Sequence, residues 1–393
     1  MKFKLTFWKV VFFVIMAVGA YGTFVRFVYG LGASTNLSDQ FPWGIWIGFD
    51  VLCGVMLAAG GFTLTAAVHI FNIKKLEPIV RPTVLTAFMG YLLVSVALIY
   101  DLGRPYNIWH PLVMRNPHSV MFEVAMCVML YTMVLSLEFS PIVLERFKME
   151  KALRIVRGAL IPLVILGVLL STLHQSSLGT MYLIMPNKLH PFWYSPLLPA
   201  FFFISAIAVG LAMTIFESSL SSKYFHKQLE LPILQTLGRV LVVVMAVYII
   251  LRFEDLLHRG MLWQIIHPGT HAYERNLFLL EIALLAAGFV MLCFRRVRNT
   301  PGGLYLSAVL VLLGFVTNRL NVSITGMEAQ AGVRYIPKWT EIGVTAAFVA
   351  AGFAIFGTAA KYLPIFEDEH GHSTPDPIKN EVEAEAVAIH AGH

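Results

Sequence analysis

The stretch LLPAFFFISAIAVGLAMTIF, residues 197–216, runs for twenty residues without a charged side chain. A helix of about 20 mostly apolar residues is long enough to cross the hydrocarbon core of a bilayer. Short loops connect this stretch to nine others of the same kind. The ten predicted spans are residues 9–30, 45–71, 82–102, 118–142, 154–175, 196–218, 233–255, 275–294, 303–321 and 339–360. The sequence therefore predicts an all-α bundle of about ten transmembrane helices within residues 1–362.

The composition of the whole chain agrees with a bundle embedded in a membrane. Of its 393 residues, 58% are hydrophobic and 13% are charged, and that charged share is about half the share usual in soluble proteins. The net charge of +6 raises the question of nucleic-acid binding. The basic residues, however, lie in short clusters between apolar runs and form no basic domain. We therefore expect no nucleic-acid partner.

The two ends of the chain are expected to differ. Lys2, Lys4 and Lys9 precede the first apolar run, as in a signal peptide, but no A-x-A-like cleavage site follows. An uncleaved first helix is therefore predicted. Residues 363–393 are rich in Glu, Asp, His and Pro and have no apolar period, which predicts a disordered cytoplasmic tail. Metal binding by the histidines of this tail is the less favoured alternative.

The distribution of Lys and Arg predicts the orientation of the bundle, because cytoplasmic loops are enriched in these residues. One side receives eighteen of them, from both termini and from residues 72–81, 143–157, 219–232 and 295–302. The loops on the other side hold seven. Both termini are therefore predicted to be cytoplasmic.

Ionisable and amide side chains within the spans are predicted to gather toward the outer side. Such residues are costly in a bilayer and usually face the interior of the bundle or a cavity. With both termini inside, fourteen of them fall in the outer third: Arg26, Asp50, Asp101, Arg104, Glu123, His174, Gln175, Arg252, Glu254, Asp255, Glu281, Asn318, Arg319 and Glu341. Each one alone could be a helix-end residue that reaches the interface. Together they predict a polar pocket that opens toward the outer side.

The inner half has fewer charges, notably Glu138, Glu217 and Arg239. Glu123, Cys127, Tyr131 and Glu138 lie roughly on one helix face, and the two glutamates are separated by about 22 Å along the axis. This spacing suits a proton relay across the membrane. The alternative is that Glu138 and Glu217 simply end inner helix turns near cytoplasmic basic residues.

The positions of histidine and cysteine restrict which redox groups the chain can hold. A membrane haem b usually has two histidine ligands at matching depth, and only His69 and His174 lie in or near spans, at opposite ends. The three cysteines, Cys53, Cys127 and Cys293, have no C-x-x-C spacing. We therefore expect no haem b, no iron–sulfur cluster and no metal site, so electrons for any redox reaction must come from a partner.

Eight short strings occur in order along the bundle. They are FPWGIWIGFD (41–50), AAGGF (58–62), DLGR (101–104), SVMFE (119–123), LEFSP (137–141), LHQSSLG (173–179), IFESSL (215–220) and LRFE (251–254). Together they resemble the NrfD/PsrC-like family of quinone-reactive membrane subunits, most closely the ten-helix branch found with hydrogenase-2. The resemblance covers roughly residues 20–362.

The resemblance implies a multi-pass subunit of the bacterial inner membrane that carries no cofactor of its own. Such a subunit passes electrons between a periplasmic ferredoxin-like iron–sulfur subunit and menaquinone or ubiquinone during anaerobic respiration. In a hydrogenase complex, the [NiFe] large and small subunits lie beyond the ferredoxin. Proton translocation from the cytoplasm would accompany quinone reduction.

The family's functional polar positions match ten residues: Asp50, Tyr91, Asp101, Arg104, Glu123, Glu138, His174, Gln175, Glu217 and Arg252. By this resemblance His174 and Gln175, with Arg252 nearby, would bind the quinone carbonyls, and Asp101 and Arg104 would belong to the same site. Glu123 and Asp50 would exchange protons with the quinone. Glu138 and Glu217 would connect the site to the cytoplasm, with Tyr91 as a bridge.

Three other functions remain open at this stage. An equivalent subunit of a polysulfide, nitrite or multihaem-cytochrome oxidoreductase has the same membrane part, and nothing within the chain identifies the attached enzyme. A secondary transporter usually has broken helices at the midplane and an internal repeat, and neither is evident in the sequence. An anchor without quinone chemistry is the third alternative.

Overall fold

The structure, a computed structural model, describes residues 6–225, 229–267, 269 and 271–366. In these residues it consists of helices and loops, and contains no strand. The first half has α1 (Phe7–Val28), α2 (Leu31–Ser34), η1 (Trp46–Cys53), α3 (Gly54–Leu57), α4 (Gly60–Thr65), η2 (Ala66–Ile70), η3 (Lys74–Ile79), α5 (Val80–Asp101), η4 (Pro105–Asn107), α6 (His110–Val113), α7 (Val120–Arg146), α8 (Glu150–Gly158) and α9 (Leu160–Leu183). The second half has η5 (Pro186–Lys188), α10 (Leu198–Phe225), α11 (Leu231–His258), α12 (Met261–Ile266), α13 (Ala272–Cys293), α14 (Arg295–Arg298), α15 (Pro301–Leu320), η6 (Asn321–Thr325), α16 (Gly326–Ala331) and α17 (Trp339–Tyr362).

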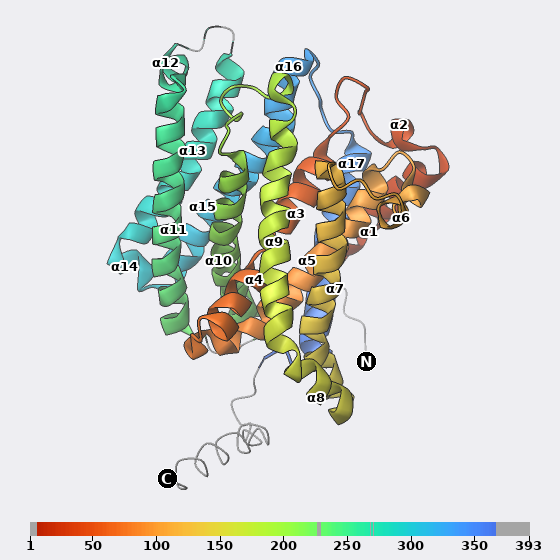
Figure 1. The fold of residues 1–393 in the computed structure, drawn as a ribbon, viewed down its shortest axis with the longest axis vertical. Coiled ribbons are helices and arrows are strands. Elements are labelled where there is room, and N and C mark those ends of the chain that lie inside the picture. The colour runs from red at the N-terminus through yellow and green to blue at the C-terminus, as the bar shows by residue number, and fades with distance from the viewer. Residues whose placement is uncertain (1–5, 226–228, 268, 270, 367–393) are drawn as a thin grey trace.

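Ten stretches in the described part of the chain are long and apolar enough to cross a membrane. They are α1, the series from η1 to η2, η3 with α5, α7, α9, α10, α11, α13, the series from α15 to α16, and α17. Figure 1 shows the long helices side by side in one bundle. This confirms the prediction of an all-α polytopic membrane protein. We call the end where α7 stops and α9 begins the inner end, and the opposite end the outer end.

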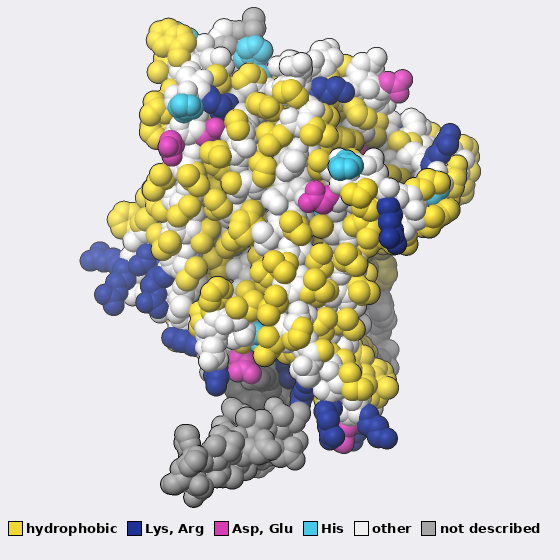
Figure 2. All heavy atoms as spheres, in the orientation of Figure 1, with side chains coloured by type: hydrophobic (Ala, Val, Ile, Leu, Met, Phe, Trp, Pro, Cys, Tyr) yellow, Lys and Arg dark blue, Asp and Glu magenta, His cyan; other side chains and the backbone are white. Residues whose placement is uncertain are grey.

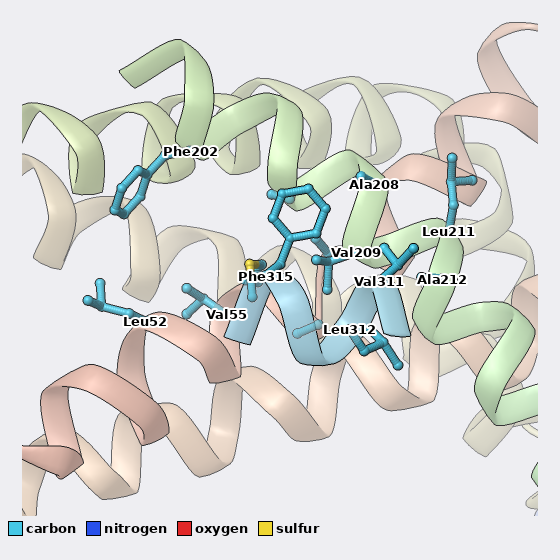
Figure 3. Packing of buried hydrophobic residues seen from close by; sticks show 14 of the residues in the cluster. Leu52, Val55, Phe202, Ala208, Val209, Leu211, Ala212, Val311, Leu312 and Phe315 are labelled. Carbon is cyan, nitrogen blue, oxygen red and sulfur yellow. The ribbon is translucent and has the colours of Figure 1, made fainter. Parts of the chain in front are cut away.

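Helix α10 lies at the centre of the packing. It contacts α9, α11 and α15 and also the irregular second span. Around it, α7 packs on α9, α13 packs on α15, and α1 packs on α17 although these two are the first and last helices of the chain (Figure 1). Figure 3 shows the apolar contact at this centre, where Val55, Val209 and Phe315 come together from α3, α10 and α15.

The second span lies deep in the bundle and is irregular. Two π-helical segments and a break at Ala58 interrupt it. At the break, glycines allow two backbones to touch: a Cβ on Gly210 of α10 would lie 2.8 Å from the carbonyl carbon of Ala59. Small residues permit such close approach between membrane helices. This contact draws α10 against the second span.

Two predicted spans are shifted in the structure. The fifth was predicted at 154–175, whereas α9 covers Leu160–Leu183 and a separate helix, α8, precedes it. The ninth was predicted at 303–321 but continues through η6 and α16 to Ala331. In both cases the helix continues through Ser, Thr, Asn or Gly residues that lower the local hydropathy but are buried against neighbouring helices. Hydropathy alone therefore ended these spans too early.

The expected boundary of the tail also moves. Ile365 is fully buried in a small apolar cluster with Val84, Leu85, Phe139 and Ile142. The packed chain therefore extends at least to Phe366, four residues beyond the predicted end of the bundle. The remainder of the predicted tail lies outside the described residues.

Candidate functional site

Five buried polar residues from three helices meet in the middle of the bundle. Ser171, His174 and Gln175 lie on one face of α9, since residues three and four apart are neighbours on a helix. Tyr91 of α5 and Tyr131 of α7 face them. All five side chains are at most 1% exposed. We call this group the His174 cluster.

The rings of the cluster are in contact, but their polar atoms are not paired. The Tyr91 and Tyr131 ring centroids lie 4.7 Å apart at 82°, and the Tyr91 and His174 centroids lie 5.8 Å apart. Gln175 Nε2 donates to the Val55 carbonyl at 3.2 Å. Six other atoms form no hydrogen bond of normal geometry: both ring nitrogens of His174, both tyrosine hydroxyls, Ser171 Oγ and Gln175 Oε1. Ser171 and Gln175 nevertheless lie close to the Tyr91 hydroxyl, and Ser171 also lies close to the Tyr131 hydroxyl.

Buried polar atoms in proteins are nearly always hydrogen-bonded, so this concentration requires an explanation. The described residues contain twelve such unpartnered side-chain atoms, and half of them belong to the His174 cluster. A polar ligand or ordered water would complete them. The set contains donors, acceptors and one imidazole, so it can hydrogen-bond a small polar head group and exchange protons with it.

Glu123 lies beside the cluster at the edge of the bundle. It is near the start of α7, its side chain is exposed, and it accepts a 2.6 Å hydrogen bond from Ser177. Ser177 follows His174 by three residues and therefore lies one helical turn further toward the outer end. Glu123 thus connects the surroundings of the cluster to the surface of the bundle.

Two glutamates lie between the cluster and the inner end, in different helix interfaces. Glu138 of α7 faces Gly167 of α9, and a Cβ on that glycine would lie 3.0 Å from Glu138 Oε1 and 3.5 Å from the Tyr131 ring. Gly167 therefore leaves space for both side chains. Glu217 of α10 accepts a 2.7 Å hydrogen bond from Thr86 of α5.

A second buried polar group lies between α13, the ninth span and the loop before α10. The Glu281 carboxylate is fully buried and accepts hydrogen bonds from Asn318 Nδ2 (2.8 Å), Trp193 Nε1 (2.9 Å) and Asn321 Nδ2 (3.0 Å). We call these four residues the Glu281 cluster. Trp193 and Asn321 were not identified as site residues from the sequence. Nothing in the sequence indicated a hydrogen-bond partner for Trp193, and hydropathy placed Asn321 at the end of a span.

Arg319 is buried next to the Glu281 cluster, at 1% exposure. Its Nη2 donates to the Phe202 carbonyl and to Ser205 Oγ, at 3.1 and 2.8 Å. Its guanidinium carbon lies 3.4 Å from the centroid of the Phe202 ring. The charge is therefore held by α10 through a ring face and two oxygens.

Arg252 does not join the His174 cluster. Its helix, α11, packs on α10, α13 and α15. Arg252 donates to the Phe192 carbonyl at 2.9 Å and lies 3.8 Å from Asp255, which also binds Arg259 and Ser195. Arg252 therefore helps to hold the loop between α9 and α10.

The other predicted site residues lie in separate places. Asp50 accepts a 2.7 Å hydrogen bond from Thr345 of α17. Asp101 is at the outer end of α5, where one of its carboxylate oxygens has no partner. Arg104 is exposed in the following loop. Of the seven residues predicted to bind quinone, the structure brings together His174 and Gln175, and Glu123 is hydrogen-bonded to Ser177, one turn of α9 away.

The prediction that fourteen residues share the outer third is wrong for several of them. His174 is the fifteenth of the 24 residues of α9, and Glu281 is the tenth of the 22 residues of α13. Asn318 and Arg319 lie near the middle of Pro301–Ala331. The shifted helix boundaries move these residues toward the midplane. The buried polar centre therefore lies deeper than the sequence pattern indicated.

Outside the spans, His190 stabilises the loop that carries Phe192 and Trp193. Its Nδ1 accepts a hydrogen bond from the Phe192 amide at 3.2 Å, and its ring centroid lies 4.9 Å from that of His271. Burial, followed by the proximity of His271, lowers the pKa of His190 to about 4, although Glu274 partly opposes the shift. His190 is therefore neutral at pH 7.

The chain is similar to bacterial proteins over most of its length, among them these three. It is 40% identical over 363 residues to a Nitratidesulfovibrio vulgaris protein with no functional name, covering 90% of this chain and 92% of that one. It is 34% identical to the probable Ni/Fe-hydrogenase 2 b-type cytochrome subunit of Escherichia coli, over 86% and 87% of the two chains. It is 29% identical to the menaquinone reductase integral membrane subunit of Nitratidesulfovibrio vulgaris, over 93% of each chain.

The name of the E. coli relative contradicts the prediction that this chain has no haem b, and that prediction is corrected. A haem iron takes an axial ligand such as a histidine nitrogen, and His174 has two buried nitrogens without partners. The rings of Tyr91 and Tyr131 are packed in the same place. This arrangement therefore fits one axial ligand but not the porphyrin plane, and no step of the proposed chemistry passes through a haem.

No group of three or more His, Cys, Asp or Glu side chains within the described ranges is arranged to hold a metal ion. The model of one protein family, described as polysulphide reductase, NrfD, matches residues 33–330, about three quarters of the chain. That match includes both buried polar clusters and agrees with the resemblance found in the sequence. The protein is therefore a multi-pass integral membrane member of the polysulphide reductase NrfD family.

Proposed function

We propose that this chain is the quinone-reactive membrane subunit of a respiratory oxidoreductase and that the quinone head group binds at the His174 cluster. The observation that carries this proposal is the group of six unpartnered polar atoms buried on α5, α7 and α9. The names of two relatives, one from a hydrogenase and one from a menaquinone reductase, support the reaction class.

The polar atoms of the cluster suit both redox states of a quinone. A quinone carbonyl needs a hydrogen-bond donor, which the His174 ring and the Tyr91 hydroxyl supply. A quinol hydroxyl needs an acceptor, and Gln175 Oε1 is available because the amide nitrogen already binds Val55. Arg252, which holds Phe192, is outside this set.

Reduction of one quinone to quinol consumes two electrons and two protons. The electrons come from a partner subunit with iron–sulfur clusters. His174 passes a proton to the reduced oxygen, and Glu123, which is hydrogen-bonded to Ser177 one turn of α9 from His174, exchanges protons with the quinone site. Oxidation of quinol reverses each of these steps.

We also propose that protons for quinone reduction are taken up from the inner end. This uptake makes the reaction an electrogenic proton translocation. Glu138 shares the space above Gly167 with Tyr131, whose ring contacts Tyr91. This contact series supports a path from Glu138 through the tyrosines to His174. Glu217, bound to Thr86 on the same helix as Tyr91, supports a second approach from the inner end.

The proposed complex faces the periplasm from the bacterial inner membrane, with both termini of this chain in the cytoplasm. Its partners are a ferredoxin-like iron–sulfur subunit and the large and small subunits of a [NiFe]-hydrogenase, and its substrate is menaquinone or ubiquinone. The E. coli relative supports the hydrogenase assignment. The menaquinone reductase relative supports an equivalent subunit of another oxidoreductase as the alternative.

The quinone assignment is tested by replacing His174 with leucine in the intact complex. We expect quinone-linked activity to fall by about 100-fold, the usual range for loss of a proton-transfer group, while the catalytic subunits still reduce an artificial electron acceptor. Ser176→Ala is the matched control, because Ser176 is on the same helix and binds only its own turn. An inert anchor or a transporter would retain quinone activity in the His174→Leu variant.

The partner enzyme is tested separately. The complex is purified through a tag on this chain, and its nickel content is measured. We expect about one nickel per copy of this chain. A nickel-free complex that still reduces quinone would remove the hydrogenase assignment and leave the quinone assignment intact.

A further inference from the structure

A hollow at the inner end of the bundle is lined by both acidic and basic side chains. Its lining residues come from the end of α7 and the end of α17: Glu145, Arg146, Lys148, Lys361, Tyr362, Leu363 and Pro364. The short helix α8 begins two residues after Lys148, at Glu150. Figure 2 shows basic side chains gathered at this end of the molecule, below the apolar belt. We call this place the basic hollow.

The charges of the basic hollow are not balanced by the protein. Its one carboxylate, Glu145, is already shared by Arg81 and Arg157, at 3.1 and 2.8 Å. Arg146 donates to the Tyr362 carbonyl at 3.1 Å, which is a neutral acceptor. Among the described residues, neither Lys148 nor Lys361 forms an ion pair. Three cations therefore remain available to an anion.

Exposed apolar side chains lie next to these cations. Phe147 is 69% exposed, Met149 53% and Ile155 of α8 74%, and no residue of α8 is buried. A helix that carries apolar and basic residues on different faces lies in the interface between acyl chains and head groups. An acidic soluble protein would neutralise the cations but would leave the apolar side chains in water.

We propose that the basic hollow binds the head group of an anionic phospholipid. The lipid phosphate faces Arg146, Lys148 and Lys361, and its acyl chains run beside Phe147 and Ile155. Basic pockets at the ends of membrane helices are suited to such head groups, because each cation adds attraction in a region of reduced dielectric. The lipid would join α7, α8 and α17, and so hold the last helix of the chain to the middle of the bundle.

The test uses the full-length chain in nanodiscs of phosphatidylcholine alone or with added phosphatidylglycerol. Thermal unfolding is followed, and lipids retained by the protein are counted by native mass spectrometry. We expect phosphatidylglycerol to raise the unfolding temperature and to be retained in preference to phosphatidylcholine. This preference in the unmodified chain needs no variant and checks the proposal independently of folding.

The charge-removal variant is Arg146→Gln with Lys148→Gln and Lys361→Gln. All three side chains are exposed, so we expect the variant to fold and to bind phosphatidylglycerol at least about tenfold more weakly. The matched control is Lys74→Gln with Lys75→Gln and Lys223→Gln, which removes the same charge from exposed positions elsewhere at the inner end. An equal loss of phosphatidylglycerol binding in the control would overturn the proposal. So would a wild-type chain that shows no preference between the two lipids. That second result is expected if the acidic residues after Phe366 filled the hollow.

Discussion

The His174 cluster and the Glu281 cluster are both buried and polar, but they differ in how their atoms are paired. The Glu281 carboxylate accepts three hydrogen bonds, which join α13, the ninth span and the loop before α10. In the His174 cluster, six polar atoms have none. Both groups are buried, but the polar atoms of the Glu281 cluster are hydrogen-bonded to one another and those of the His174 cluster are not.

This difference separates a structural role from a chemical one. A buried carboxylate with three N–H donors is fixed in place, and removing it leaves those donors unpaired. Atoms without partners stabilise nothing in the protein alone, but they are available to a ligand. The Glu281 cluster therefore holds helices together, and the His174 cluster is the candidate site of reaction.

The largest expected effect is a loss of stability when Glu281 is replaced, and it tests whether the Glu281 cluster is structural. Replacing Glu281 with leucine leaves Trp193, Asn318 and Asn321 with buried N–H groups, each costing about 1–3 kcal/mol. We expect most of the protein to misfold, measured as the fraction that elutes as a single species in size-exclusion chromatography. Glu281→Gln keeps one acceptor and should recover part of the folded fraction. A Leu variant as stable as wild type would show that the cluster is not structural.

A matched pair of aromatic substitutions sharpens the comparison. Trp193→Phe removes a donor from Glu281, so we expect a loss of about 1–3 kcal/mol in stability and little change in quinone activity per folded molecule. Tyr91→Phe removes a hydroxyl that has no partner, so stability should remain or rise slightly while activity falls about tenfold. Unfolding in increasing denaturant and quinone reduction are measured on both variants. The reverse pattern would exchange the roles of the two clusters.

The sequence indicated the fold much better than the site. The ten apolar stretches are evident from hydropathy, and they fixed the number of spans, but the polar ends of α9 and the ninth span hid the true depth of His174 and Arg319. A depth pattern groups residues by level, whereas a site depends on which helix faces meet. Gln175 and Tyr91 meet because α5, α7 and α9 are neighbours, and Arg252, expected beside them, lies on α11 instead.

A smaller effect concerns the connection of the His174 cluster to the inner end. Glu138→Gln keeps the size of the side chain above Gly167 but cannot carry a proton. We expect proton uptake from the inner side of proteoliposomes to slow by several-fold, up to about tenfold, with the folded fraction unchanged. Ser140→Ala is the control, because Ser140 is on the same helix and its hydroxyl binds only the Leu137 carbonyl of its own turn. Unchanged uptake in both Glu138→Gln and Glu217→Gln would remove the inner path.

The smallest expected effect is a pH dependence that belongs to the Glu281 side alone. The pKa of His190 is about 4 in the folded protein, below the ordinary value near 6.5. Between these values the unfolded chain binds more protons, so stability should be constant above pH 6.5 and fall as the pH is lowered toward 4. Protonation would break the hydrogen bond from the Phe192 amide and loosen the loop that carries Trp193 to Glu281.

His190→Asn tests this dependence, because an amide oxygen can accept the same hydrogen bond but does not titrate in this range. We expect the unfolding temperature of the wild-type protein to fall between pH 7 and pH 5 by about 2 °C more than that of the variant. His118→Asn, at an exposed position in the loop before α7, should follow the wild type. If the His190 and His118 variants show the same slope, the acid sensitivity comes from elsewhere, and the loop is not the element that links Trp193 to pH.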